Sequence, residues 1–398
     1  MAPIPRLRAY DGPALFSYGF RPFFLLGAIY AGLAILMWLP VLHGQLSMTT
    51  AFGPRDWHVH EMLFGYVPAV MTGFLLTAVP NWTGRLPIQG GPLVTLVLIW
   101  IAGRAAVTFS GLIGWLPAAA VDAAFLLTLA AVVAREIVTG RNWRNLKVVA
   151  IVSVLALSNI AFHLEAFWRG AADTATRLAI GTIILLITLI GGRIVPSFTR
   201  NWLARQGAGR LPAPLDRLDQ VAIVATIIAL ATWIGLPLAP TTGAALVLAG
   251  LLQAIRLGRW AGYRALGEPL VLILHLGYAF VPIGFLLLGA AAFDLVPVSA
   301  GIHAWTAGAI GAMTLAVMTR ASLGHTGHDL TATATTQLIY VLVVIAACAR
   351  IGAALIASWT VPLLELSAFA WAGAFLGFAI VYGPLLWRRR KTAVALAQ

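Results

Sequence analysis

Charged residues are scarce in this chain of 398 residues, because only 10% of its positions are Asp, Glu, Lys or Arg and 61% are hydrophobic. A soluble domain carries about 25% charged residues, so this composition argues against a set of soluble domains. Cysteine is almost absent as well, since Cys348 is the only one. A single cysteine excludes an intramolecular disulfide, a C-x-x-C-H haem attachment and a cysteine-ligated iron–sulfur cluster.

Motifs of soluble enzymes are missing too. The chain contains no phosphate-binding G-x-x-x-x-G-K-[ST] loop, no G-x-S-x-G nucleophile elbow and no H-E-x-x-H zinc helix. Together with the lack of a soluble domain, this argues against a nucleotide-driven pump. The first 21 residues contain arginine but no apolar core, so we expect no cleavable signal peptide.

Long apolar runs, in contrast, fill the chain almost from end to end. A membrane span needs about 20 apolar residues, and runs of this length predict an all-α polytopic protein with one transmembrane domain over residues 1–398. We expect a short N-terminal segment, 1–19, and a basic C-terminal tail, 388–398. Twelve spans are predicted, at residues 20–42, 59–80, 91–110, 113–134, 146–168, 176–197, 218–236, 242–258, 269–292, 299–319, 333–357 and 366–387.

Basic residues gather on one side of these spans. If both termini are cytoplasmic, most of the 26 Lys and Arg residues fall in inner segments, and only Arg55, Arg169 and Arg177 fall in outer loops. Such asymmetry is typical of membrane topology. The net charge of +13 is therefore interpreted as a topology signal, and we predict no binding of nucleic acid.

The run Trp57-His58-Val59-His60-Glu61-Met62 opens the second predicted span. Ionisable groups inside a membrane are costly unless partnered, and histidine is the commonest metal ligand, so the run predicts a histidine-liganded cofactor. On a regular helix His58 and His60 point about 200° apart. They would serve two neighbouring pockets, or one site if the helix begins after His60. Met62 shares a face with His58 and offers a thioether suited to copper(I). The alternative is a pair of solvated histidines at the membrane interface.

Three further histidines lie within predicted spans. His303 lies four to five residues into the tenth span and precedes a stripe of small residues, which suits either helix packing or a flat macrocycle; the stripe is Ala304, Gly308, Ala312 and Ala316. His163 shares a helix face with Asn159, whose amide would fix the imidazole tautomer. His275 shares a face with Tyr278. For His163 and His275 the alternative is an ordinary hydrogen-bonded contact between helices.

Two further charged residues leave their roles open. Glu61 would act as a hydrogen-bond acceptor behind a ligand, as a carboxylate on a proton path or as a residue of the rim. Arg104 lies inside the third span and would pair with a buried anionic group, extend toward the membrane surface or contact Asp122.

Four blocks of the sequence resemble the NnrS family, and the resemblance extends from residue 16 to about residue 330. These blocks are Gly19–Phe24, Trp57–Tyr66, Gly192–Thr199 and Gly311–Ala321. The resemblance implies a twelve-span protein of the bacterial inner membrane, with bound haem and copper and a part in the response to nitric oxide.

The predicted plan also resembles that of haem–copper oxidase catalytic subunits, which arrange twelve spans in three arcs of four. In those proteins haem-ligating histidines lie on spans 2 and 10, where this chain has His58, His60 and His303. Two features differ, because span 6 has no histidine and no adjacent His-His pair follows span 7. An oxidase-type binuclear centre is therefore not expected.

These observations lead to one hypothesis and two alternatives. One of His58 and His60 would pair with His303 across a haem b, and the other would share a second metal pocket with His163, with His275 and Met62 as further candidates. Glu61, Asn159 and Tyr278 would support these ligands. The protein would bind or redox-transform nitric oxide and protect against nitrosative stress, with its electron donor and any enzymatic activity undefined. A secondary transporter and a sensor or delivery protein without catalysis are the alternatives.

Overall fold

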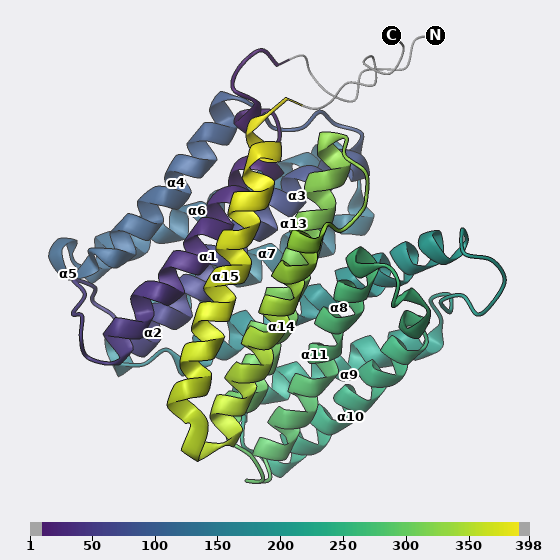
Figure 1. Cartoon of the computed structure of the whole chain (residues 1–398). Coiled ribbons are helices and arrows are strands. Elements are labelled where there is room, and N and C mark those ends of the chain that lie inside the picture. Colours follow the sequence, from purple (N-terminus) through teal and green to yellow (C-terminus); the bar gives the residue numbers. More distant parts are fainter. Residues whose placement is uncertain (1–9, 390–398) are drawn as a thin grey trace. The chain divides into compact units, whose positions relative to one another are not determined.

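The computed structural model describes residues 10–389, and every regular element within them is a helix. Twelve of these helices are long and apolar enough to cross a membrane (Figure 1). This confirms the all-α polytopic class and the predicted number of spans. Residues 1–9 and 390–398, which belong to the predicted terminal segments, lie outside the described residues.

The observed spans follow the predicted ones closely, but four of them are longer by eight or nine residues. Spans 2, 6, 10 and 12 extend beyond their apolar runs because the flanking residues, many of them polar, continue the helix. The spans are Phe20–Leu42 (α1), Pro54–Thr83 (α2 and α3), Gly91–Thr108 (α4), Trp115–Thr139 (α6), Trp143–Arg169 (containing α7), Asp173–Leu203 (α8), Arg217–Gly235 (α9), Pro240–Gly258 (α10), Pro269–Ala291 (α11), Val298–Thr326 (α12 and α13), Ala334–Leu355 (α14) and Ala357–Trp387 (containing α15).

Local sequence signals explain where several of these helices begin and end. Proline occupies the first turn of α4, α10 and α11, where its missing N–H is not needed. Helix α9 begins with a capping box, in which the Asp216 side chain accepts from the Leu218 N–H at 3.0 Å and Asp219 accepts from the Asp216 N–H at 3.2 Å. Helix α3 (Val67–Thr83) is followed by Gly84, whose φ of 71° suits glycine.

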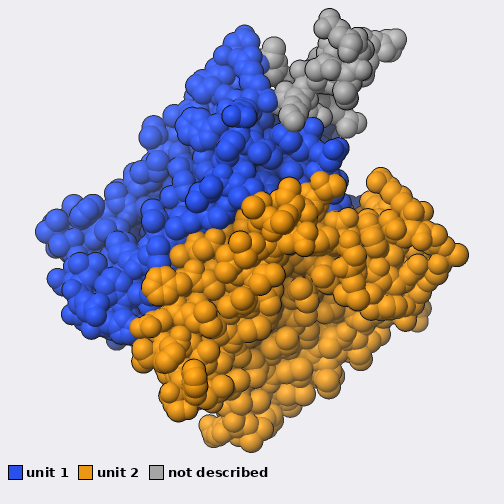
Figure 2. Space-filling view, in the orientation of Figure 1, with its two compact units in different colours: residues 1–179, 317–330, 375–398 blue, residues 180–316, 331–374 orange. Residues whose placement is uncertain are grey.

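Contacts divide the described chain into two compact units (Figure 2). Unit 1 contains residues 10–179, 317–330 and 375–389, and unit 2 contains residues 180–316 and 331–374. Within unit 1, α1 packs on α3, and α6 packs on both α4 and α7. Within unit 2, α10 contacts α9 and α11, and α11 also contacts α12. The expectations of one domain and of three four-helix arcs are not tested by this division and stay predictions.

Two spans contain a π-helical turn, and each turn directly follows a histidine. Helix α2 (Pro54–His60) leads into the π-helical turn Glu61–Tyr66, and α12 (Val298–His303) leads into a second one, Ala304–Ile310. A π-helix forms i→i+5 hydrogen bonds and is frequent at functional sites. The α-helical spacing that predicted a shared face for His58 and Met62 therefore does not apply across the first turn.

The second π-helical turn also alters the predicted stripe of small residues. All four residues of the stripe are nevertheless buried. A Cβ added to Gly308 would lie 2.4 Å from the Phe280 ring of α11, so the glycine is needed for close packing of the two helices. This contact supports the helix-packing interpretation of the stripe.

Candidate metal centre

Two histidines and one aspartate meet inside unit 1. The Asp122 Oδ2 atom lies 3.1 Å from His60 Nε2 and 3.0 Å from His163 Nε2. The three residues offer ligand atoms that all lie within 4.8 Å of one another. Their exposed fractions are 0% for His60, 1% for Asp122 and 4% for His163. Two imidazole nitrogens and a carboxylate oxygen form a donor set suited to copper, zinc or iron.

Three helices place these residues at a common depth. His60 ends α2, Asp122 lies seven residues after the start of α6, and His163 lies six residues before the end of α7 (Leu146–Arg169). With a rise of 1.5 Å per residue, each lies about 10 Å from the nearby end of its span. Helices α6 and α7 pack on each other, which brings His163 beside Asp122 (the helices can be followed in Figure 1).

The side chains behind the histidines are oriented as ligand supports. Glu61 Oε1 lies 2.9 Å from His60 Nδ1, and metal-binding histidines commonly bond their second nitrogen to a carboxylate. Asn159 donates from Nδ2 to Asp122 Oδ2 at 2.8 Å, and its Oδ1 lies 3.0 Å from His60 Nε2. Thus Asn159 supports Asp122 and His60. Asp122 also bonds His163, which lies one turn after Asn159 on α7.

Arg104 of α4 links the two carboxylates of this cluster. Its Nη1 donates to both Glu61 oxygens at 2.6 Å, and its Nη2 donates to Asp122 Oδ1. Tyr30 of α1 donates its hydroxyl hydrogen to Glu61. Gly103 permits this approach, because a Cβ there would lie 3.3 Å from the Asp122 Cα. The buried carboxylates are therefore both paired, as charges in a low-dielectric interior require.

Aromatic rings enclose the cluster. The Phe64 and Phe162 ring centroids each lie 5.2 Å from that of His60, and both residues are fully buried. Phe52 lies on the loop before α2, with its ring 5.2 Å from His60 and 5.3 Å from His163. Because Phe52 is only half-buried, it separates the two imidazoles from the surface. Its loop is held by the Ser110 Oγ atom, which accepts from the Ala51 N–H at 2.8 Å.

The two histidines of the opening run point in different directions, as helical geometry predicts. His60 lies in the cluster, whereas the His58 ring stacks on Trp38 of α1 at 4.2 Å and an interplanar angle of 25°. Met62 is half-buried at the second position of the π-helical turn. Its role as a metal ligand stays a prediction.

The other predicted residues lie in unit 2. His303 Nδ1 donates to the Ser299 carbonyl at 2.7 Å, and His275 Nε2 lies 2.8 Å from Thr199 Oγ1 of α8. Tyr278 accepts from Arg256 at 3.0 Å and donates to Gln253 at 2.8 Å. This tyrosine therefore belongs to a hydrogen-bond network distinct from the His275–Thr199 pair. Any pairing of these residues with the histidines of unit 1 stays a prediction.

Sequence reasoning left Asp122, Arg104 and Tyr30 out of the predicted site. It did offer a contact between Arg104 and Asp122 as one alternative, and the structure confirms that contact. The sequence signal for two of these residues was that Arg104 and Asp122 carry opposite charges at similar depths on consecutive spans. Of the three roles open to Glu61, a place on the rim is wrong, because the residue is 0% exposed and hydrogen-bonds His60.

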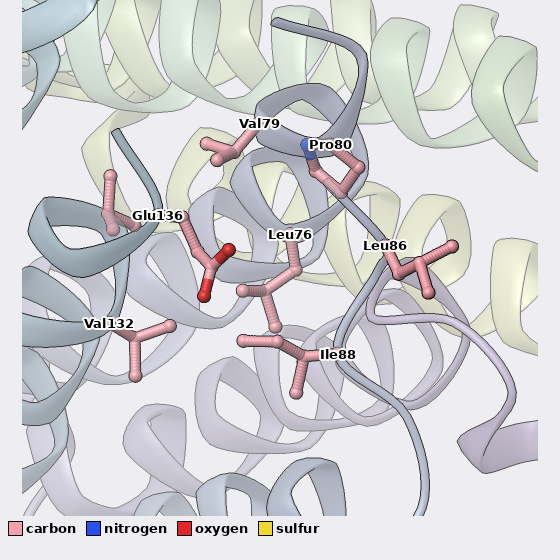
Figure 3. A pocket seen from close by; sticks show the side chains of 8 residues that line it. Leu76, Val79, Pro80, Leu86, Ile88, Val132 and Glu136 are labelled. Carbon is pink, nitrogen blue, oxygen red and sulfur yellow. The ribbon is translucent and has the colours of Figure 1, made fainter. Parts of the chain in front are cut away.

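A small pocket elsewhere in unit 1 offers no comparable donor set (Figure 3). It is lined by Leu76, Val79, Pro80, Leu86, Ile88, Val132, Val133 and Glu136. Glu136 is the only lining residue with a charged side chain, and its carboxylate is paired with Arg85 and Arg135. Because no imidazole or thiol lines this pocket, it lacks the ligands that a metal centre needs. The His60–Asp122–His163 cluster, which has them, is therefore the candidate metal centre.

The fold and the site define a class of polytopic α-helical membrane proteins with a buried histidine–carboxylate cluster. The family model described as NnrS protein matches residues 14–390. The match covers nearly the whole chain, so the protein belongs to the NnrS family, as its four sequence blocks predict. No curated protein matches the chain.

Proposed function

We propose that this NnrS-family protein binds copper and haem b within the membrane and uses them to bind or redox-transform nitric oxide, protecting the cell against nitrosative stress. The observation that carries the proposal is the buried cluster of His60, Asp122 and His163. Membership of the NnrS family supports metal-containing cofactors. Nitric oxide is small, neutral and membrane-soluble, so a site inside the bilayer needs no charged entry path.

The residues of the cluster fit a copper ion. His60 and His163 would donate their Nε2 atoms, and Asp122 would donate Oδ2. Glu61 would keep the proton of His60 on Nδ1, which leaves Nε2 as the ligating nitrogen. Bound copper would supply a redox-active Lewis acid in a site that Phe52, Phe64 and Phe162 shield from water.

The residues proposed for haem are His58 and His303. His60 is less suited to hold haem, because both of its ring nitrogens already have partners in the cluster. The bond from His303 Nδ1 to the Ser299 carbonyl fixes the tautomer in which Nε2 is the ligating nitrogen. Haem held by these histidines would supply an iron centre able to bind nitric oxide.

Separate removal of the two sets of ligands tests the proposal. The full chain is expressed with copper and a haem precursor, purified in detergent, and measured for its Soret band and copper content. We expect His163→Ala to lose copper and keep the Soret band, and His303→Ala to lose or shift the Soret band and keep copper. The exposed His43 provides the control, because His43→Ala should change neither signal.

The absence of both copper and the Soret band from the unchanged protein would contradict the proposal. An unchanged spectrum in His303→Ala would reject that residue as a haem ligand. Addition of nitric oxide should shift the Soret band. Consumption of nitric oxide with an added electron donor would then distinguish an enzyme from a sensor or a delivery protein.

A further inference from the structure

The charges around the candidate metal centre do not cancel. Among the described residues, the charged side chains hydrogen-bonded to its histidines and aspartate are Glu61 and Arg104. Histidine must be neutral to ligate a metal, so the fixed charges are those of Asp122, Glu61 and Arg104. Two carboxylates and one guanidinium leave a net charge of minus one.

A residual charge in this environment is costly. Glu61 and Asp122 are 0% and 1% exposed, and Arg104 is 6% exposed, within helices that cross the membrane. An uncompensated ion loses much of its hydration energy in such a place. A singly charged metal ion brings the centre to neutrality, whereas a divalent ion leaves it with one positive charge.

We infer that Arg104 is the specificity-determining residue of this centre, and that by offsetting one of the two carboxylates it tunes the site to a singly charged metal ion. Cuprous copper is the monovalent ion that takes imidazole ligands, and zinc and cupric ions are its divalent competitors. Arg104 donates to both carboxylates and therefore lies close to the proposed ion. Because the Coulomb energy scales with the charge of the ion, its positive charge opposes a divalent ion twice as strongly as a monovalent one at the same position. The inference rests on the proposed metal site and concerns the charge of the ion that this site prefers.

Four variants leave the proposed metal ligands in place; two of them change the net charge of the centre and two keep it. Arg104→Gln gives a net charge of minus two, and Glu61→Gln gives zero. The double variant Glu61→Gln/Arg104→Gln returns the centre to minus one with both charged partners of the ligands removed. Arg104→Lys keeps the native charge but changes the geometry of the hydrogen bonds.

The measurements are the affinities of each full-length variant for Cu⁺ and Zn²⁺, obtained by competition with chelators, and the midpoint potential of bound copper. We expect Arg104→Gln to lower the ratio of Cu⁺ to Zn²⁺ affinity at least tenfold. Its copper potential should fall by about 59 mV or more, which is the one-electron equivalent of tenfold. Glu61→Gln should shift both quantities in the opposite direction. In the double variant and in Arg104→Lys, the ratio of Cu⁺ to Zn²⁺ affinity should stay within about threefold of that of the unchanged protein.

The double variant decides the outcome. If it behaves like Arg104→Gln, or if all variants keep the native selectivity, the inference is wrong while the metal site stands. If the unchanged protein binds neither ion, the proposed function fails as well. If Arg104→Gln fails to fold, two other variants still test the inference. Glu61→Gln must raise the ratio of Cu⁺ to Zn²⁺ affinity, and the double variant must keep the native ratio. If either result fails to appear, the inference is wrong.

Discussion

Replacement of Asp122 by Asn tests whether the carboxylate is both the anchor of the cluster and a metal ligand. The substitution keeps the shape of the side chain and removes its charge. Asp122 receives hydrogen bonds from Arg104, Asn159 and His163, and its loss leaves the buried guanidinium with Glu61 as its charged partner. Breaking a buried ion pair costs about 3–5 kcal/mol. Because Glu61 remains, we expect a value at the lower end, about 3 kcal/mol.

Asn159→Ala is the matched comparison. It removes two hydrogen bonds from the same cluster, to Asp122 and His60, but no charge. Hydrogen bonds between membrane helices contribute about 0.6 kcal/mol each, so this variant should lose about 1 kcal/mol. The loss of stability should therefore follow the removal of charge rather than the number of hydrogen bonds removed.

Reversible unfolding in detergent, with a chelator present, measures both losses in the metal-free protein. Copper is then added at 100 times its dissociation constant, which should stabilise the unchanged protein by about 2.7 kcal/mol. Asn159→Ala should retain most of this gain, and Asp122→Asn should lose it. The reasoning is refuted if the metal-free Asp122→Asn protein is no less stable than Asn159→Ala, or if both gain equally from copper.

Three further predictions concern access, packing and pH. Phe52→Ala should speed the removal of copper by a soluble chelator at least tenfold without changing copper content, because the Phe52 ring covers both imidazoles; an unchanged rate would show that access lies elsewhere. Gly65→Ala should weaken copper binding, since its Cβ would lie 2.7 Å from Arg104 Nη1, whereas Gly53→Ala, where the added Cβ meets open space, should not. The hydrogen bond from Arg259 lowers the pKa of Asp216 to about 2, below its ordinary value of about 3.9. Its contribution to stability is therefore complete above that ordinary value and lost as pH falls through 2, so the thermal midpoints of Asp216→Asn and the unchanged protein should differ at pH 5 and converge toward pH 2.

The spans were predictable because membrane helices need long apolar runs, and that requirement is readable without knowing how helices pack. His60 and His163 could be assigned to a similar depth for the same reason. Their lateral approach could not, since it depends on which helices are neighbours. For this reason the sequence predicted a contact between Arg104 and Asp122 only as one alternative, and did not predict that both residues belong to the site. The π-helical turns escaped prediction because no residue pattern distinguishes an i→i+5 bond from an i→i+4 bond.

The π-helical turn Glu61–Tyr66 has a consequence for how this span tolerates changes in length. Such a turn accommodates one residue more than an α-helix along the same path would need. Deleting a residue from it would let regular hydrogen bonds close while the flanking helical segments keep their directions. The side chains of the turn itself would then face new directions, among them Glu61, which hydrogen-bonds His60 and Arg104. A shortened chain would thus exchange the support of the metal centre for a more regular helix, so deletions are expected to be excluded from this short segment even where the surrounding membrane helices accept many substitutions.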